Sequence, residues 1–230
     1  MRRHHRAAPA RWLPLAPMLA AATAACFPAV THGPRVEPGL AAGLTGAYTV
    51  GPTHVEGDEG GIRLRSGVVG AYGGYGWAPA SARAPRLHVA IAVPILFPLA
   101  QVDAFVQAPP AWTGPLSAGA GIVASSEGVH AYGQAGRVSA RGMGWYLTGG
   151  YGRRESWSTV ESSSPAWFGA AAVQLAAGHA RTHLFVQGAD GRIPGRCPFG
   201  QGGRCERGER ARALAVGATL GWARRRAGED

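Results

Sequence analysis

Apolar and polar side chains alternate along most of the chain. In the stretch 40–50, Leu44 and Tyr48 fall on one face, whereas Thr45 and Thr49 fall on the other. A period of two residues predicts β-strands, and no stretch shows the periodicity of a helix. The pattern divides into ten segments, at 39–51, 60–77, 85–97, 99–108, 115–125, 128–139, 142–154, 165–178, 180–188 and 211–224.

The length of these segments and their aromatic residues favour a membrane barrel. Most have about the 9–11 residues that a tilted strand needs to cross a bilayer. Aromatic residues gather near the segment ends, as in the girdles of such barrels; they are Tyr48, Tyr72, Trp77, Phe97, Trp112, Trp145, Tyr151, Trp167 and Trp222. We therefore predict an all-β fold, an antiparallel up-and-down transmembrane β-barrel of eight to ten strands over residues 39–224. A soluble β-sandwich or lipocalin-like domain is the alternative, since its strands alternate in the same way.

The second face of the segments carries polar and charged residues, which in a barrel would point into the lumen. The candidates for lumen-facing side chains are Arg63, Arg65, Arg86, His88, Asp103, His130, Arg181 and His183. Four Arg against one Asp would favour anions in a channel. The three His of this set lie on different segments, so we expect hydrogen-bonded lumen residues and no metal site.

Loop lengths indicate which end of the barrel faces outward. The three longest connections contain PTHVEGDE, RRESWSTVESSS and ADGRIPGRCPFGQGGRCERGER, and each follows an odd-numbered segment. In an up-and-down barrel these three therefore leave from the same end. Outer-membrane barrels have long outer loops and short inner turns. We thus expect an outer-membrane protein with its N-terminus on the periplasmic side.

The start of the chain has the form of an export signal. A basic stretch, MRRHHRAAPAR, precedes the short apolar run WLPLAPMLAAATAA, and this order is typical of a secretory signal peptide over residues 1–25. The four residues Thr23 to Cys26 resemble the lipobox of bacterial lipoproteins. That resemblance implies cleavage before Cys26 and attachment of diacylglycerol to its sulfur. Residues 26–38 contain several Pro and no periodicity, and we predict a lipidated tether.

The last segment carries a second resemblance. GATLGW, with Gly217, Leu220 and Trp222 at the matching places, resembles the C-terminal β-signal by which outer-membrane proteins are recognised for assembly. The resemblance implies the barrel-assembly machinery as a partner. The chain departs from that pattern because a polar tail, residues 225–230, follows the aromatic residue.

Cysteine usage and charge fit an exported protein. Cys197 and Cys205 lie close together in a Gly-rich stretch, and we expect them to form a disulfide in an oxidising compartment. The formal net charge is +10, but every basic residue other than His is Arg, and the four Arg in residues 1–11 leave with the signal. An exported protein meets no nucleic acid in its normal place, so we do not predict nucleic-acid binding.

The sequence contains none of the GxSxG, HExxH or Walker motifs, so an enzyme is the less favoured class and we predict no cofactor. We predict an outer-membrane lipoprotein of structural, adhesive or surface-interaction type. Its expected partners are outer-membrane lipids and an anionic surface polysaccharide or a protein. A small anion-preferring, porin-like channel is the first alternative, and a lipid-tethered soluble binding protein is the second.

The first testable prediction concerns Cys26. Because small residues precede this cysteine at the end of a short apolar run, we expect the mature chain to begin there. Mass spectrometry of protein purified from membranes should find no residue before Cys26 and a mass that includes acyl chains. An unmodified chain, or a chain that starts elsewhere, would contradict the prediction. The Cys26→Ser variant serves as the control, because it should remain unacylated.

Overall fold

We analysed a computed structural model, which describes residues 32–49, 54–55, 67–94, 100–125, 128–139, 141–154, 164–192 and 210–224. The strands are β1 (Gly39–Thr49), β2 (His54–Val55), β3 (Gly67–Trp77), β4 (Arg86–Pro94), β5 (Gln101–Gln107), β6 (Ser117–Ser125), β7 (Gly128–Val138), β8 (Gly144–Arg154), β9 (Ser164–Ala177), β10 (Ala180–Arg192) and β11 (Arg210–Arg224). One short helix, α2 (Pro110–Thr113), lies between β5 and β6. No helix in the described part of the chain is long and apolar enough to span a membrane.

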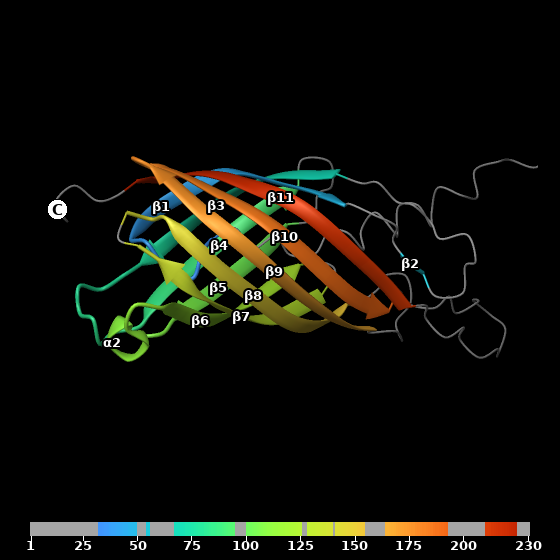
Figure 1. Ribbon diagram of the computed structural model, residues 1–230, viewed down its shortest axis with the longest axis horizontal. Coiled ribbons are helices and arrows are strands. Elements are labelled where there is room, and N and C mark those ends of the chain that lie inside the picture. Colours follow the sequence, from blue (N-terminus) through green and yellow to red (C-terminus); the bar gives the residue numbers. More distant parts are fainter. Residues whose placement is uncertain are drawn as a thin grey trace, which may run out of the picture.

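Ten of the described strands form one closed barrel (Figure 1). From β3 to β11, each strand pairs antiparallel with the next, and β1 pairs with both β3 and β11. The two-residue strand β2 adds a short pairing to β11 at Ala211 and Arg212. This topology confirms the prediction of an antiparallel up-and-down barrel, at ten strands. A β-sandwich would instead split the strands between two packed sheets.

The two ends of the barrel differ. We call the end at which β1 begins and β11 ends the turn rim; it carries the connections 78–85, 108–116, 139–143 and 178–179. The opposite end, the loop rim, is where the connections 50–66, 155–163 and 193–209 leave and return, although most of those residues lie outside the described part of the chain. The two longest connections, 50–66 and 193–209, therefore share one rim, as parity predicts, and 155–163 leaves from the same rim, although it is no longer than 108–116 on the turn rim. Gly178, with a φ of 57°, supplies the left-handed residue in the tight turn between β9 and β10.

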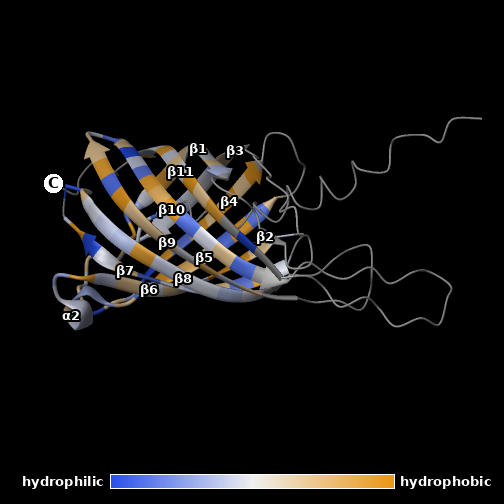
Figure 2. Cartoon of the chain, turned by 45° about the vertical axis from the view of Figure 1, so that its right-hand side comes forward, coloured by the Kyte–Doolittle hydropathy of each residue, from blue (hydrophilic) through white to orange (hydrophobic). Residues whose placement is uncertain are grey.

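The outer face of the barrel is apolar. Buried and exposed residues alternate along β7 without interruption, and Figure 2 shows hydrophobic and hydrophilic residues alternating along the strands. Large apolar side chains on the outer face are 40–65% exposed on the strands, among them Leu40, Leu44, Val89, Ile91, Leu147, Val173, Leu184 and Leu220. In a soluble barrel the same side chains would face inward, so this surface suits a lipid environment.

Large aromatic residues fill the lumen, and each lies against a glycine of a neighbouring strand. The pairs are Phe105 with Gly119, Tyr132 with Gly121, Phe168 with Gly150, Phe185 with Gly217, and Tyr72 with Gly43; Tyr72 also reaches Gly221 on β11, the strand beyond β1. A Cβ atom added to any of these glycines would overlap the aromatic ring. The lumen is narrow. A bulky side chain on one strand fits there because the facing residue on a nearby strand is glycine and has no side chain.

One aromatic assignment from the sequence was wrong. Tyr72 was expected in an outer girdle, but its side chain is 8% exposed and faces the lumen. The neighbouring residues Tyr75 and Trp77, at 43% and 52% exposure, are the outward-facing aromatics of β3. The physical reason is the period of two, since residues 72 and 75 must lie on opposite faces of one strand.

The aromatic–glycine pairing predicts opposite effects for two adjacent glycines of β8. In Gly150→Ala, the new methyl group would meet the Phe168 ring and the Ala131 carbonyl oxygen, and overpacking of this kind costs about 1–3 kcal/mol. Gly149 faces outward with no atom within 4 Å of an added Cβ, so Gly149→Ala should be neutral or stabilise by up to about 1 kcal/mol. Urea unfolding of the protein in detergent micelles measures both free energies.

If both variants lost stability equally, the assignment of faces on β8 would be incorrect. Combining Gly150→Ala with Phe168→Leu provides a further check. The smaller side chain should recover part of the loss, because it relieves the same contact.

Candidate functional site

The described part of the predicted tether lies inside the barrel. Residues 32–38, which we call the plug, run from the lumen to the turn rim and continue directly into β1. Val36 is 2% exposed and packs in a cluster with Phe105, Val123, Tyr132 and Phe168. Its backbone N–H donates to Gln107 Oε1 at 2.8 Å. This segment therefore does not extend away from the barrel, as a tether would, but fills part of its lumen.

The inner end of the plug joins a polar network. His32 Nε2 lies 3.0 Å from Tyr132 Oη and 3.2 Å from Asp103 Oδ2. Tyr132 donates its hydroxyl proton to Asp103 Oδ1 at 2.6 Å, and Gln134 Nε2 donates to the His32 carbonyl at 3.2 Å. The His32 ring also lies 4.4 Å from the His88 ring, centre to centre. Because the carboxylate is only 2% exposed, these contacts replace the water that an aspartate would otherwise need.

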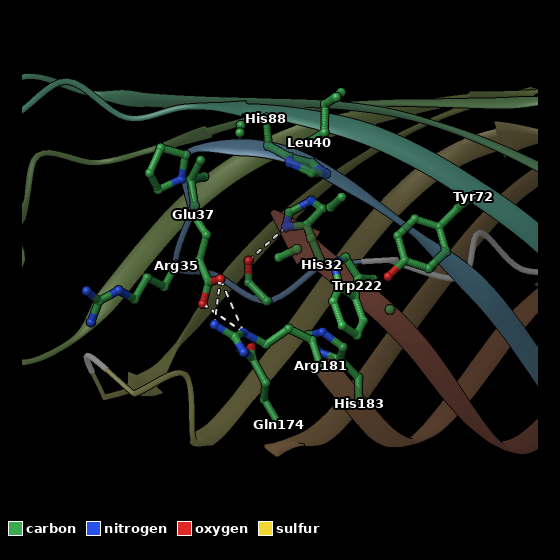
Figure 3. Close-up of a pocket in the computed structure, with 18 residues that line it drawn as sticks. His32, Arg35, Glu37, Leu40, Tyr72, His88, Gln174, Arg181, His183 and Trp222 are labelled. Atoms are coloured by element: carbon green, nitrogen blue, oxygen red, sulfur yellow. Dashed lines mark hydrogen bonds and ion pairs between the residues drawn. The ribbon is translucent and has the colours of Figure 1, made fainter. Parts of the chain in front are cut away.

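An ion pair fixes the other end of the plug. The Arg181 guanidinium donates to both carboxylate oxygens of Glu37, at 3.0–3.2 Å, and the two groups face each other in Figure 3. Arg181 also donates to the carbonyls of Gly178 and Ala180. The Arg35 side chain reaches the Val138 carbonyl at 3.4 Å. The plug is thus held to several strands through charged and polar groups, and not by apolar burial alone.

A small cavity remains beside the plug. Its volume is about 60 Å³, and its lining includes Tyr72, His88, Gln174, Arg181 and His183 (Figure 3). The side chains of His88 and Gln174 each have one buried polar atom without a hydrogen-bond partner in the described part of the chain. A polar cavity of this size has room for a few ordered waters, but it is far smaller than the roughly 300 Å³ at which pockets for drug-sized ligands begin.

The structure places most of the predicted lumen residues inside. His88, Asp103, His130, Arg181 and His183 are buried in the interior. Arg86 is half-buried at the start of β4, whereas Arg63 and Arg65 lie outside the described residues. The described residues bring no three His, Cys, Asp or Glu side chains into a group that could hold a metal ion.

Other residues singled out in the sequence are scattered. Cys26, Cys197 and Cys205 lie outside the described residues, so lipidation and the disulfide stay predictions. In the resemblance to an assembly signal, Leu220 and Trp222 are 56% and 60% exposed on the outer face. Gly217 instead faces inward, beneath the Phe185 ring.

Sequence reasoning missed the residues through which the plug is held in the lumen. Glu37, Tyr132 and Val36 have roles that depend on contacts between distant parts of the chain. The one local signal was the run Arg35-Val36-Glu37 between Pro34 and Pro38, which places two charges around an apolar residue in a stretch otherwise typical of a linker.

No protein-family model matches the chain, and comparison with curated proteins gave no match either. One similar solved structure is the solid-state NMR structure of outer membrane protein AlkL in DMPC lipid bilayers. It shares 13% sequence identity with this chain, over 89% of this chain and 98% of that chain, with a TM-score of 0.34. The fold described above rests on the strand pairing of this chain itself.

The plug contacts predict the effect of removing one charge. In Glu37→Gln, the Arg181 cation, whose side chain is 7% exposed, would lose its anionic partner. Breaking a buried ion pair in this way costs about 3 kcal/mol. Urea unfolding should show this loss, and a thiol introduced as Val36→Cys in a cysteine-free background should react faster with maleimide when Glu37 is also replaced.

The matched control is Asp190→Asn, which breaks the exposed Arg212–Asp190 pair at 3.2 Å. An exposed pair contributes less than about 1 kcal/mol, so this variant should change neither stability nor thiol reactivity appreciably. Equal behaviour of the two variants would show that Glu37 does not hold the plug.

Proposed function

We propose that this chain is an outer-membrane β-barrel lipoprotein whose lumen is sealed by its own N-terminal segment, and which acts through its outer surface and loops as a structural or surface-interaction protein. The observation that carries the proposal is the combination of an apolar outside with a filled inside. A transport channel needs only an apolar outer face, whereas a sealed barrel needs an apolar outer face and a filled lumen.

The outer face supports membrane insertion by its height as well as its polarity. On β1, the exposed residues run from Leu40 to Tyr48. Eight residue steps at about 3.3 Å give roughly 26 Å along the strand, and a tilt of 35–45° reduces this to about 20 Å along the barrel axis. This is close to the roughly 25 Å apolar band of outer-membrane barrels. A soluble lipocalin-like domain that exposed an apolar band of this height to water would aggregate.

The proposal includes a lipid on Cys26 and display of the connections 50–66, 155–163 and 193–209 at the cell surface. Both follow from sequence patterns and from the sidedness that is usual for such barrels. The connection 193–209 contains Arg196, Arg204 and Arg207 against Glu206 and Glu209. This excess of Arg would suit an anionic surface polysaccharide or an acidic protein as partner.

The small anion-preferring channel is the second candidate. The observation in its favour is the polar character of the inner wall, where Gln107, Gln134, Gln174 and Gln187 are all buried. Against it, Arg181 is neutralised by Glu37, and the apolar cluster around Val36 occupies the lumen. A conducting state would therefore require displacement of the plug.

Two measurements on the purified protein test the proposal. Heat-modifiable migration on a gel reports a folded membrane barrel, and single-channel recording in a planar bilayer reports an open lumen. We expect heat-modifiable migration and no sustained current for the natural chain, because the plug and its apolar cluster occupy the lumen. A steady anion-selective current from the natural chain would favour the channel instead.

A deletion of residues 32–38 serves as the comparison in the same recordings. If the plug seals the lumen, this variant should show more frequent openings than the natural chain while it keeps its heat-modifiable migration. Failure of the natural chain to migrate in a heat-modifiable way would reject the membrane barrel itself.

A further inference from the structure

The turn rim is set apart by its tryptophans. Trp77, Trp112, Trp145 and Trp222 all belong to this rim, and each is 49–77% exposed. Trp112, on α2, is the most exposed of the four. Indole rings concentrate where hydrocarbon meets the headgroup layer, because one end of the ring is apolar and the other donates a hydrogen bond. The turn rim therefore lies at the depth of lipid headgroups if the barrel spans a bilayer.

Basic residues accompany three of these tryptophans. Arg137 pairs directly with Trp145 across β7 and β8, and both are exposed on the outer face. The connection 78–85 carries the exposed Arg83, and its Ala82 carbonyl accepts a hydrogen bond from the Ala111 N–H, next to Trp112.

The turn that leads into β8 adds another cation, the exposed Arg141. In the tight turn between β9 and β10, the His179 ring lies 5.5 Å from the ring of Trp222. The turn rim therefore carries basic side chains in several of its turns, and one of them, His179, contacts an aromatic ring of the same rim.

These arginines have no carboxylate partner in the described part of the chain. The described carboxylates are Glu37, Asp103 and Asp190. Glu37 binds Arg181, and Asp103 binds His32 and Tyr132 inside the lumen. Asp190 binds Arg212 at the loop rim. The guanidinium groups of Arg83, Arg137 and Arg141 thus have no carboxylate partner among the residues that the structure describes.

We infer that the turn rim binds the phosphate groups of anionic phospholipids, with phosphatidylglycerol-type headgroups held by Arg83, Arg137 and Arg141 between the exposed tryptophans. The inference rests on the proposed membrane function. Guanidinium groups bind phosphate through two parallel hydrogen bonds, and the indoles fix the depth at which those phosphates lie. The turn rim of such a barrel faces the phospholipid leaflet, because short turns lie on the periplasmic side.

The inference predicts a lipid preference that can be measured. A basic residue near an anionic membrane surface contributes about a fivefold preference, which is diluted when it is averaged over all lipids around the barrel. The full mature chain would be inserted into phosphatidylcholine vesicles with a trace of spin-labelled phosphatidylglycerol or spin-labelled phosphatidylcholine. The fraction of motionally restricted label gives the relative association constant. We expect a several-fold preference for phosphatidylglycerol, and a decrease as salt rises.

The variant R83Q/R137Q/R141Q should bring the two lipids close to parity. The matched control is R212Q, an exposed arginine at the opposite rim that already has a carboxylate partner, and it should keep the preference of the natural chain. If the triple variant fails to insert, the salt dependence of the natural chain decides the matter, since headgroup pairing must weaken as salt screens it.

The outcomes separate this inference from the proposed function. A natural chain that migrates in a heat-modifiable way but shows equal association with both lipids would overturn the phospholipid site and leave the membrane barrel standing. A preference that survives both the triple variant and high salt would also overturn it. A chain that inserts into neither kind of vesicle would overturn both proposals together.

Discussion

The pairing of β1 with β11 is the interaction on which the rest of the structure depends. It runs from Leu40 opposite Arg224 to Thr49 opposite Ala215, and it removes the two edges that the sheet would otherwise have. In hydrocarbon, each unpaired backbone group costs several kcal/mol, so an open sheet could not present this apolar face to lipid. On the inner face of the seam, the Thr45 and Thr219 hydroxyls lie 3.0 Å apart, and Thr219 is 0% exposed. Since β1 starts where the plug ends, the seam also sets where the plug lies.

The strands and their two faces could be predicted because the information is local. Alternation places Leu44 outside and Thr45 inside whatever the neighbouring strand is, and the predicted segments agree with the strands to within a few residues at most ends. The segment 60–77 is the exception, since its described strand starts at Gly67. The inward positions of His88, Asp103 and His183 follow from the same period of two.

The plug and its contacts inside the lumen could not be predicted, because they depend on strand register and on residues that are distant in sequence. His32 meets Tyr132, one hundred positions away in sequence, and nothing near either residue indicates the other. The prolines around Arg35 and Glu37 are as compatible with an exposed linker as with a plug. The glycines are similar: Gly149 and Gly150 look equivalent in the sequence, but only Gly150 lies beneath the Phe168 ring. The expected excess of positive charge in the lumen was too large for the same reason, because Glu37 was not counted among the lumen residues.

The direct continuity of the plug with β1 has a thermodynamic consequence. Residues 32–38 behave as a ligand that is covalently joined to its own binding site, with no linker between Pro38 and Gly39 to dilute it. Short connections of this kind correspond to effective concentrations in the millimolar range or above. A free solute or peptide that competes for the lumen must exceed that concentration or bind more tightly than the plug. At such a concentration, the plug needs only a modest intrinsic affinity for the lumen to remain bound.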